Sequence, residues 1–271
     1  MKSNFYEGKH VLITGASTGI GRQLTLQLLE KGAIVFAVSR SMAKLEEVVE
    51  LSRNFSGKIV PFAVDLSTYD NCKKLFDAYY AQFKRLDILI NNAGIGHFSG
   101  FVDTKRQDYE YVVQTNFMAP LYITQLFFGL LRNGLDPRVV NICSSGAFYG
   151  IAFRGVYCAS KAGMRAWSQA LSLEFRRFGI EVFTVIPGST KTNFFDNQIG
   201  RAPKAHRIPG KIELPQALSA RILKSLIGKG RELNCSLPNK LILYLSVLCP
   251  ALLKMMIQRA IAAEEEHIYR S

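Results

Sequence analysis

The feature that most constrains the fold is a regular alternation of short, almost wholly apolar runs with longer amphipathic ones. Residues 33–40 (AIVFAVSR) and 180–188 (IEVFTVIPG) exemplify the apolar runs, and residues 21–32 (GRQLTLQLLEKG) the amphipathic ones. Apolar strands that alternate with helices are typical of a parallel sheet covered by helices on both faces. We therefore predict a doubly wound α/β fold in a single domain that spans residues 1–271.

The elements follow from the hydrophobic period and the turn residues. Pro120 lies inside a long helical pattern and predicts a kink or break there. After Pro187 the chain is less regular, and from about residue 188 to 271 we expect a loop, short helices and an apolar tail that begins near Leu241. We predict strands within residues 9–15, 33–40, 58–65, 86–94, 138–145 and 180–188, and helices within 21–32, 44–53, 71–83, 104–131, 157–178 and 215–227.

The charge is strongly basic and uneven. The chain has a formal net charge of +13. Residues 191–240 contain ten Lys and Arg and three acidic residues, so this segment alone has a net charge of 10 − 3 = +7. A basic surface attracts phosphorylated cofactors, anionic lipid or nucleic acid, or it simply provides solubility. Nucleic-acid binding is disfavoured, because the basic residues show no aromatic interleaving and no recognition motif.

Cysteine and histidine usage argues against disulfides and metals. The five cysteines form no CxxC pair, and the four histidines show no ligand spacing, so we predict no metal site and a reducing compartment. No apolar signal segment precedes the first strand-like run, which predicts a cytoplasmic protein.

A glycine-rich turn follows the first predicted strand. Residues 14–21 read TGASTGIG and lead directly into a predicted helix. Glycines let the backbone approach a pyrophosphate closely, and the helix N-terminus offers N–H groups to the anion. The alternative is a glycine-rich turn without a ligand. The residues expected to hold the cofactor here are Gly15, Ser17, Thr18, Gly19, Ile20 and Gly21.

The end of the second strand indicates which dinucleotide is bound. An acidic residue about 20 positions past the glycines would bind the 2′-hydroxyl of NAD, whereas arginine can pair with the 2′-phosphate of NADP. Ser39 and Arg40 end this strand, and no acid lies between Ala33 and Ser41. We therefore predict NADP(H), with a solvated strand-end charge as the alternative for Arg40.

In this order, the motifs resemble those of the short-chain dehydrogenase/reductase family. They are TGASTGIG, Asp65, NNAG at residues 91–94, Asn116, Ser144, YCASK at 157–161 and PGSTKT at 187–192. The resemblance covers about residues 8–192 and implies a Rossmann-type fold. It also implies a homodimer or homotetramer. The last 75 or so residues match nothing specific, and in this family that part usually shapes the substrate pocket.

The resemblance also implies residue roles. Tyr157 matches the acid/base, Lys161 its partner, Ser144 the donor to the substrate oxygen, and Asn116 the anchor of a proton-relay water. Ser144 lies the family's common 13 residues before Tyr157, with adjacent Ser145 as the alternative. Further cofactor contacts are expected at Asp65 for adenine, at Asn91, Ala93 and Gly94 for the adenosine ribose, and at Pro187, Gly188, Thr190 and Thr192 for the nicotinamide.

These residue types suit carbonyl reduction. Ser144 can polarise the carbonyl and Tyr157 can deliver the proton, while NADPH supplies the hydride. Free tyrosine titrates near ~10, and we expect the Lys161 ammonium to lower the pKa of Tyr157. The alternatives are a catalytically idle dinucleotide sensor on the same fold, and a nucleotide-sugar epimerase or dehydratase. The latter enzymes are usually longer and carry a TGxxGxxG turn.

Aromatic residues lie between Ser144 and Tyr157 and again after the predicted nicotinamide-binding segment, where they can line an apolar pocket beside the nicotinamide. They predict an apolar small-molecule substrate, such as a lipid, keto-sphingoid or steroid. The tail at residues 241–253 (LILYLSVLCPALL) is shorter than the ~20 residues that span a bilayer. Together with its basic flanks, over residues 240–259, it is expected to cover the pocket, form a subunit interface or contact an anionic membrane peripherally. The substrate-contact candidates are His97, Ser145, Phe148, Tyr149, Phe153, Phe194 and Phe195.

Overall fold

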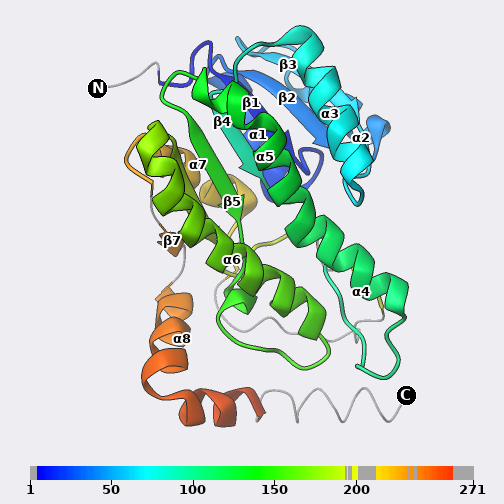
Figure 1. Cartoon of the computed structure of the whole chain (residues 1–271), viewed down its shortest axis with the longest axis vertical. Helices are drawn as coiled ribbons and strands as arrows, with labels where there is room; N and C mark the ends of the chain where they lie inside the picture. The colour runs from blue at the N-terminus through cyan, green and yellow to red at the C-terminus, as the bar shows by residue number, and fades with distance from the viewer. Residues whose placement is uncertain are drawn as a thin grey trace.

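The computed structural model confirms a doubly wound parallel sheet with helices on both faces (Figure 1). It describes residues 5–192, 194, 197–200, 212–230, 232–234 and 237–258. The seven strands lie in the order β3-β2-β1-β4-β5-β6-β7, and every pair is parallel. The strands are β1 His10–Thr14, β2 Ile34–Ser39, β3 Lys58–Ala63, β4 Ile88–Asn91, β5 Arg138–Ile142, β6 Glu181–Ile186 and β7 Glu232–Asn234.

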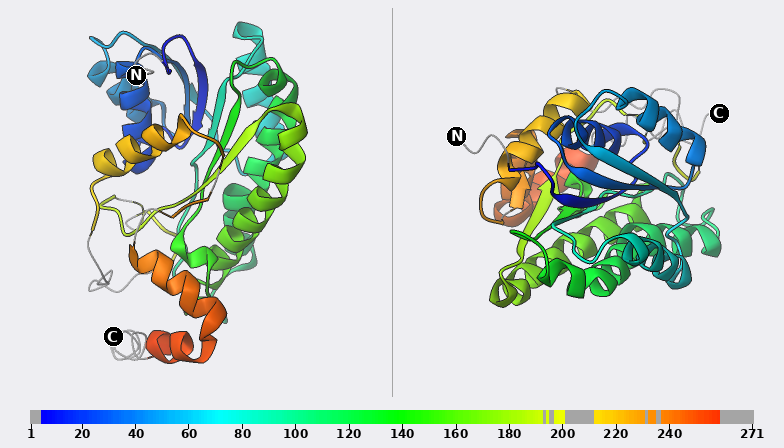
Figure 2. Two further views of the ribbon diagram at one scale, coloured as in Figure 1. Left: turned by 90° about the vertical axis from the view of Figure 1, so that its left-hand side faces the viewer. Right: turned by 90° about the horizontal axis from the view of Figure 1, so that it is seen from above.

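Helices α1, α2 and α7 cover one face of the sheet, and α3, α5 and α6 cover the other (Figure 2). Successive side chains of a strand point to opposite faces. Val11 and Ile13 of β1 accordingly pack with the layer of α1, α2 and α7, whereas Leu12 packs with α3, α5 and α6. The helices are α1 Gly19–Glu30, α2 Met42–Leu51, α3 Tyr69–Gln82, α4 Arg106–Val113, α5 Ala119–Arg132, α6 Gly155–Phe175, α7 Pro215–Leu226 and α8 Leu237–Leu248.

The chain stays helical through Pro120, and the irregularity near this residue is a π-helical segment rather than a break. Gln114–Met118 separates α4 from α5, and Pro120 lies at the start of α5, where its missing N–H is tolerated. Such π turns occur frequently at functional sites. Asn116 lies within this one.

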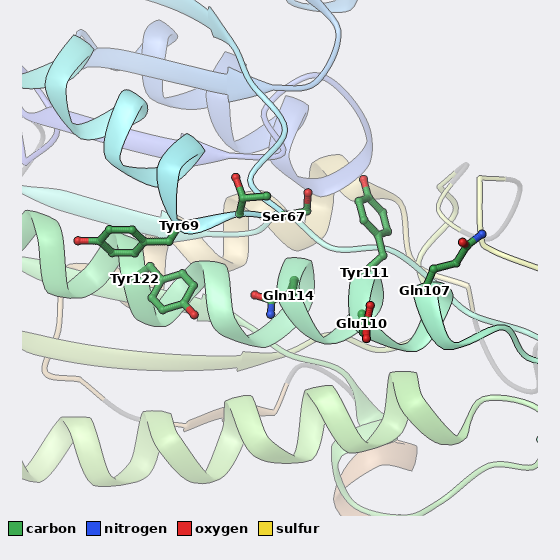
Figure 3. Close-up of a pocket in the computed structure, with 8 residues that line it drawn as sticks. Ser67, Tyr69, Gln107, Glu110, Tyr111, Gln114 and Tyr122 are labelled. Carbon is green, nitrogen blue, oxygen red and sulfur yellow. The ribbon is translucent and has the colours of Figure 1, made fainter.

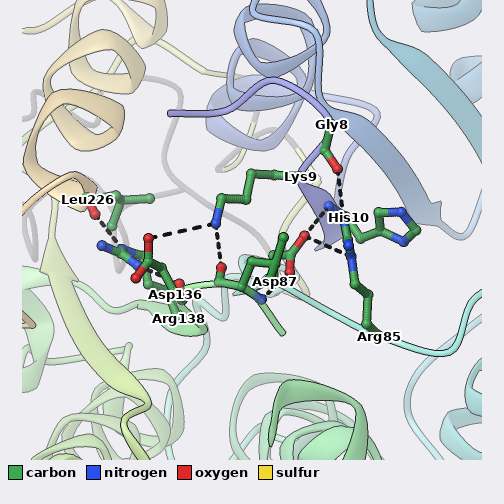
Figure 4. Close-up of polar contacts among 9 residues, drawn as sticks. Gly8, Lys9, His10, Arg85, Asp87, Asp136, Arg138 and Leu226 are labelled. Carbon is green, nitrogen blue, oxygen red and sulfur yellow. Dashed lines mark hydrogen bonds and ion pairs between the residues drawn. The ribbon is translucent and has the colours of Figure 1, made fainter. Parts of the chain in front are cut away.

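A polar network joins the amino ends of the central strands (Figure 4). The buried Asp87 carboxylate accepts hydrogen bonds from the backbone N–H of His10, at 2.7 Å, and of Leu135, at 2.6 Å. Arg138, also buried, donates from Nε to the carbonyl oxygen of Leu226 in α7. These bonds hold together the amino ends of the strands, which lie opposite the glycine-rich turn. The carboxyl ends of the strands therefore remain available for a site.

The tail is helical. α8 is followed by a second helix, Pro250–Gln258, at an angle of 119°. Both lie at one end of the molecule, beyond the edge strand β7 (Figure 1). No single helix in the described part of the chain is long and apolar enough to cross a membrane, although this bent pair together has the length and composition to do so.

Candidate active site

Three positions at the turn between β1 and α1 require glycine, namely Gly15, Gly19 and Gly21. Gly15 and Gly19 have φ angles of +67° and +54°. A Cβ on Gly21 would lie 2.1 Å from the carbonyl oxygen of Gly15. Asn92 secures the turn by donating from Nδ2 to the carbonyl oxygens of Thr14 and Gly15, at 3.0 and 3.1 Å. The backbone is therefore held where the N-terminus of α1 can receive a phosphate.

The ends of β2 and β3 place Arg40 and Asp65 within reach of a common partner. Arg40 Nη1 donates to the Tyr111 hydroxyl at 2.8 Å, and that hydroxyl donates to Asp65 Oδ2 at 2.9 Å. Sequence reasoning missed Tyr111, because it lies on α4, far along the chain from both partners. Ser39, just before Arg40, is buried, and its Oγ donates to the carbonyl oxygen of Ser41 at 3.0 Å.

The residues after β4 form the middle of the site. Asn91 donates from Nδ2 to Asn141 Oδ1 at 2.8 Å and to Thr124 Oγ1 at 3.2 Å, which links β4 to β5 and α5. The Ala93 amide donates to Thr14 Oγ1 at 3.0 Å. At Gly94 a Cβ would approach Lys161 Nζ to 3.4 Å. The lack of a side chain there leaves room directly beside the lysine.

Asn116 and Lys161 are held by backbone carbonyl groups. Asn116 Nδ2 donates to the carbonyl oxygen of Ile95 at 2.9 Å, and its Oδ1 accepts from the Ile95 amide at 2.7 Å. Asn116 also donates to Ser160 Oγ at 3.2 Å. Lys161 Nζ donates to the carbonyl oxygen of Ile142, at the end of β5, at 3.0 Å. Burial lowers the pKa of Lys161.

Tyr157 is almost fully buried, with an exposed fraction of 7%. Burial raises the pKa of its phenol to about 12, while a hydrogen bond with Ser144 and the positive charge of Arg154 act in the opposite direction. The expectation that Lys161 would lower this pKa below its ordinary value is therefore wrong for the cofactor-free chain. The reason is that desolvation of the phenolate outweighs the stabilising groups.

Of the two adjacent serines, Ser144 is the one that hydrogen-bonds with Tyr157. Its Oγ also accepts from the Gly146 amide at 3.2 Å, which fixes the hydroxyl at the end of β5. A Cβ on Gly146 would lie 3.6 Å from both Ser144 Oγ and the Tyr157 ring. Ser145 instead begins a short 3₁₀ turn, Ser145–Ala147.

The segment after β6 faces the glycine-rich turn. Thr190 donates from Oγ1 to the carbonyl oxygen of Gly188 at 3.0 Å and pairs with Glu213 in an isolated bridge. A Cβ on Gly19 would lie 3.1 Å from the methyl carbon of Thr192. The predicted phosphate-binding and nicotinamide-binding segments are thus neighbours.

The expected substrate residues do not all lie together. The Phe194 ring lies against the Tyr157 ring, with the two centroids 6.0 Å apart. Phe153, with a φ of +61°, stacks on Phe98 at 5.5 Å. Phe148 packs against the guanidinium of Arg165, 4.9 Å from its ring centroid, and His97 is buried beside Thr104. Tyr149 is half-buried, and Phe195 lies outside the described residues.

A surface pocket of about 590 Å³ adjoins the Asp65 side of the site (Figure 3). Tyr111 is one of its lining residues, so this side chain lies between the pocket and the Arg40–Asp65 pair. The pocket is lined by Ser67, Thr68, Tyr69, Gln107, Glu110, Tyr111, Gln114 and Tyr122.

Comparison with known proteins adds independent evidence. A family model described as short chain dehydrogenase matches residues 9–201. The chain is 30% identical over 220 residues to the 3-oxoacyl-acyl-carrier-protein reductase of Thermotoga maritima, covering 80% of this chain and 89% of that protein. It is 32% identical over 188 residues to the 3-ketodihydrosphingosine reductase of Bacteroides thetaiotaomicron, covering 69% of this chain and 66% of that protein. The crystal structure of a metagenomic short-chain oxidoreductase in complex with NADP matches with a TM-score of 0.72 and 25% identity, covering 86% of this chain and 97% of that chain.

Proposed function

The chain belongs to the short-chain dehydrogenase family of oxidoreductases, and from that premise we propose that it uses NADP(H) to interconvert a ketone or aldehyde and an alcohol. The observation that carries the proposal is the set of polar side chains at the carboxyl ends of β4 and β5. Lys161 lies beside Gly94, and Ser144 hydrogen-bonds with Tyr157. A buried phenol next to a hydroxyl donor is suited to proton transfer at a carbonyl oxygen.

The residues fit a dinucleotide phosphorylated on its adenosine ribose. The close backbone approach at Gly15 and Gly21 provides the cradle for a pyrophosphate, and Arg40 provides the charge for a 2′-phosphate. The NADP held by the metagenomic relative supports this choice. Asp65, Ala93, Thr190 and Thr192 would contact the remaining groups. When bound, NADPH supplies the hydride.

The chain's own residues handle the oxygen and its proton. Ser144 would donate to the carbonyl oxygen and stabilise the charge that develops there. With a pKa of about 12 in the cofactor-free chain, Tyr157 is protonated at neutral pH and ready to donate. After donation, the phenolate would be stabilised by Ser144 and by the positive charges of Lys161 and Arg154. Asn116, fixed by Ile95, would anchor a relay that returns the proton.

An apolar carbonyl compound is the substrate class that the surroundings favour. Phe194 lies against Tyr157, and Phe98 and Phe153 stack on each other from two loops, the one after β4 and the one between β5 and α6. The Ser99 amide donates to the carbonyl oxygen of Phe153 at 2.9 Å, which joins these two loops, and the Phe98 amide donates to the carbonyl oxygen of Ile199, five residues after Phe194, at 2.9 Å. The two relatives are reductases of a 3-oxoacyl and a 3-keto sphingoid compound, which supports this class.

We extend the proposal to the tail, which would contact an anionic lipid surface where such substrates partition. Val247 and Leu248 of α8 are 72% and 73% exposed, and Leu252, Met255 and Met256 of the next helix are also exposed. An apolar surface of this kind on a chain of net charge +13 matches an anionic bilayer.

The tail is tested by sedimentation with anionic phosphatidylserine-containing vesicles. The double variant Val247→Ser/Leu248→Ser should lose binding while keeping its melting temperature. Leu173→Ser is the matched control, because it removes an apolar side chain of α6 that is 77% exposed far from the tail in sequence. Failure of the unmodified protein to sediment contradicts the membrane contact. A double variant that becomes monomeric would assign the surface to a subunit interface instead.

The catalytic proposal is tested by NADPH consumption with a panel of long-chain keto compounds, steroids, retinals and small ketones. We expect turnover of long apolar carbonyls in preference to small polar ones. Tight NADPH binding without turnover of any member would support an idle dinucleotide sensor and contradict the proposal.

A further inference from the structure

A single hydroxyl group connects two cofactor-binding candidates. The Tyr111 hydroxyl accepts from Arg40 Nη1 at 2.8 Å and donates to Asp65 Oδ2 at 2.9 Å. The three side chains come from separate places in the fold, namely the end of β2, the segment after β3, and α4. Their connection is therefore a product of the tertiary structure.

The Asp65 end of this connection is rigid. Its second oxygen, Oδ1, accepts from the Ser67 amide at 2.9 Å. Its backbone carbonyl oxygen accepts from Asn71 Nδ2 at 2.7 Å. The Tyr111 ring lines the pocket between α3 and α4, with its hydroxyl directed towards the ends of the strands (Figure 3). The Tyr111 hydroxyl oxygen, which accepts the hydrogen bond from Arg40, is thus fixed in position.

The Tyr111 hydroxyl remains neutral at physiological pH. Burial, followed by the hydrogen bond with Asp65, raises the pKa of Tyr111, and Arg40 opposes that shift. A neutral hydroxyl both accepts and donates, as this bridge requires. Arg40, by contrast, is an exposed side chain, and an exposed arginine samples many rotamers unless a partner restricts it.

We propose that Tyr111 is a specificity-determining residue of the cofactor site, which holds the Arg40 guanidinium where it receives the 2′-phosphate of NADP(H). This inference rests on the proposed cofactor choice. A guanidinium carries five N–H donors, and the bond to Tyr111 uses one of them, so the others remain for phosphate oxygens. Holding the side chain in place removes part of the entropy that phosphate binding would otherwise lose.

The consequence differs between the two nicotinamide cofactors. NADH has no 2′-phosphate and gains nothing from an ordered Arg40. Loss of the Tyr111 hydroxyl should therefore weaken NADPH binding more than NADH binding. A general loosening of the site would weaken both equally.

The test compares Tyr111→Phe with Tyr109→Phe in the full chain. Tyr109 lies on the same helix, and its hydroxyl donates to the carbonyl oxygen of Phe101 at 3.0 Å, so it is a matched loss of one hydroxyl group. Dissociation constants for NADPH and NADH are measured by fluorescence titration without substrate. For Tyr111→Phe we expect the NADPH constant to rise about 3- to 10-fold, from immobilisation of one long side chain, and the NADH constant to change less than about twofold. Tyr109→Phe should change neither.

Two further comparisons show whether Tyr111 acts through Arg40, and whether a negative result contradicts this inference alone or the proposed cofactor choice as well. In an Arg40→Ala background, Tyr111→Phe should have no further effect on NADPH, and an undiminished effect there would overturn the inference. If the unmodified chain prefers NADPH and Tyr111→Phe preserves that preference, only the inference fails. If the unmodified chain binds both cofactors equally, the proposed cofactor choice fails and the inference fails with it.

Discussion

Lys161 lies one helical turn after Tyr157 on α6, and its Nζ donates to the carbonyl oxygen of Ile142 at 3.0 Å. The lysine is almost fully buried, and burial lowers its pKa. The ammonium is therefore held at the end of β5, beside Gly94, where it can serve the cofactor as well as the phenol.

This arrangement predicts opposite effects of Lys161→Met on stability and on function. Removing a desolvated charge while keeping similar side-chain volume should raise the free energy of unfolding by about 1 kcal/mol. NADPH binding should weaken and turnover should be lost. Urea unfolding and cofactor titration measure the two effects. A variant destabilised by more than about 1 kcal/mol would show that the ammonium is instead a structural requirement.

Arg40→Asp should invert the cofactor preference. A carboxylate at the end of β2 repels a 2′-phosphate and can accept from a ribose 2′-hydroxyl. We expect the unmodified chain to bind NADPH at least about tenfold more tightly than NADH, which corresponds to about 1.4 kcal/mol. Paired titrations of both proteins measure this. Equal affinities in the unmodified chain would contradict the assignment of Arg40.

Two glycine substitutions should change stability in opposite directions. Gly21→Ala would place a Cβ 2.1 Å from the Gly15 carbonyl oxygen, so the phosphate-binding turn must distort, and both stability and NADPH binding should fall. Gly129→Ala is the control, because that helical position in α5 has nothing within 4 Å and alanine should stabilise it by about 0.5–1 kcal/mol. Unimpaired NADPH binding by Gly21→Ala would refute a phosphate cradle at this turn.

Local patterns predicted most of the sheet, because strands buried on both faces are apolar throughout. β7 was not among the predicted strands, since a three-residue strand is too short to show a period. Tyr111 was not identified, because its role depends on a contact among three elements distant in sequence. The pKa of Tyr157 was expected to fall but rises, because sequence shows the neighbouring cation and not the extent of burial.

The buried thiols and phenols predict a loss of stability at alkaline pH. Burial raises the pKa of Cys72 to about 12, of Cys143 to about 11 and of Tyr157 to about 12. An unfolded chain releases these protons nearer pH ~8.5 for cysteine and ~10 for tyrosine, so above about pH 9 the folded state retains protons that the unfolded state loses. The free energy of unfolding should therefore fall as pH rises from about 9 towards 12.

Urea unfolding of the unmodified protein and of Cys72→Ala, at about pH 7.5 and about pH 10, checks this dependence. The substitution should lower stability at the first pH, because it empties a buried site. It should also reduce the difference between the two pH values. The same pH dependence in both proteins would exclude Cys72 as a contributor.

The central claim, that Tyr157 supplies the proton for hydride transfer from NADPH to a carbonyl carbon, is tested most directly with deuterated cofactor. The unmodified protein and Tyr157→Phe are each given NADPH deuterated at the transferable position and a long-chain keto substrate, and deuterium at the product's carbinol carbon is followed by mass spectrometry. We predict deuterium transfer by the unmodified protein. The rate should be about 10²–10⁴-fold lower in Tyr157→Phe, with the NADPH dissociation constant unchanged within about threefold. Transfer by Tyr157→Phe at more than about a tenth of the unmodified rate would contradict the account, because the proton would then come from another group.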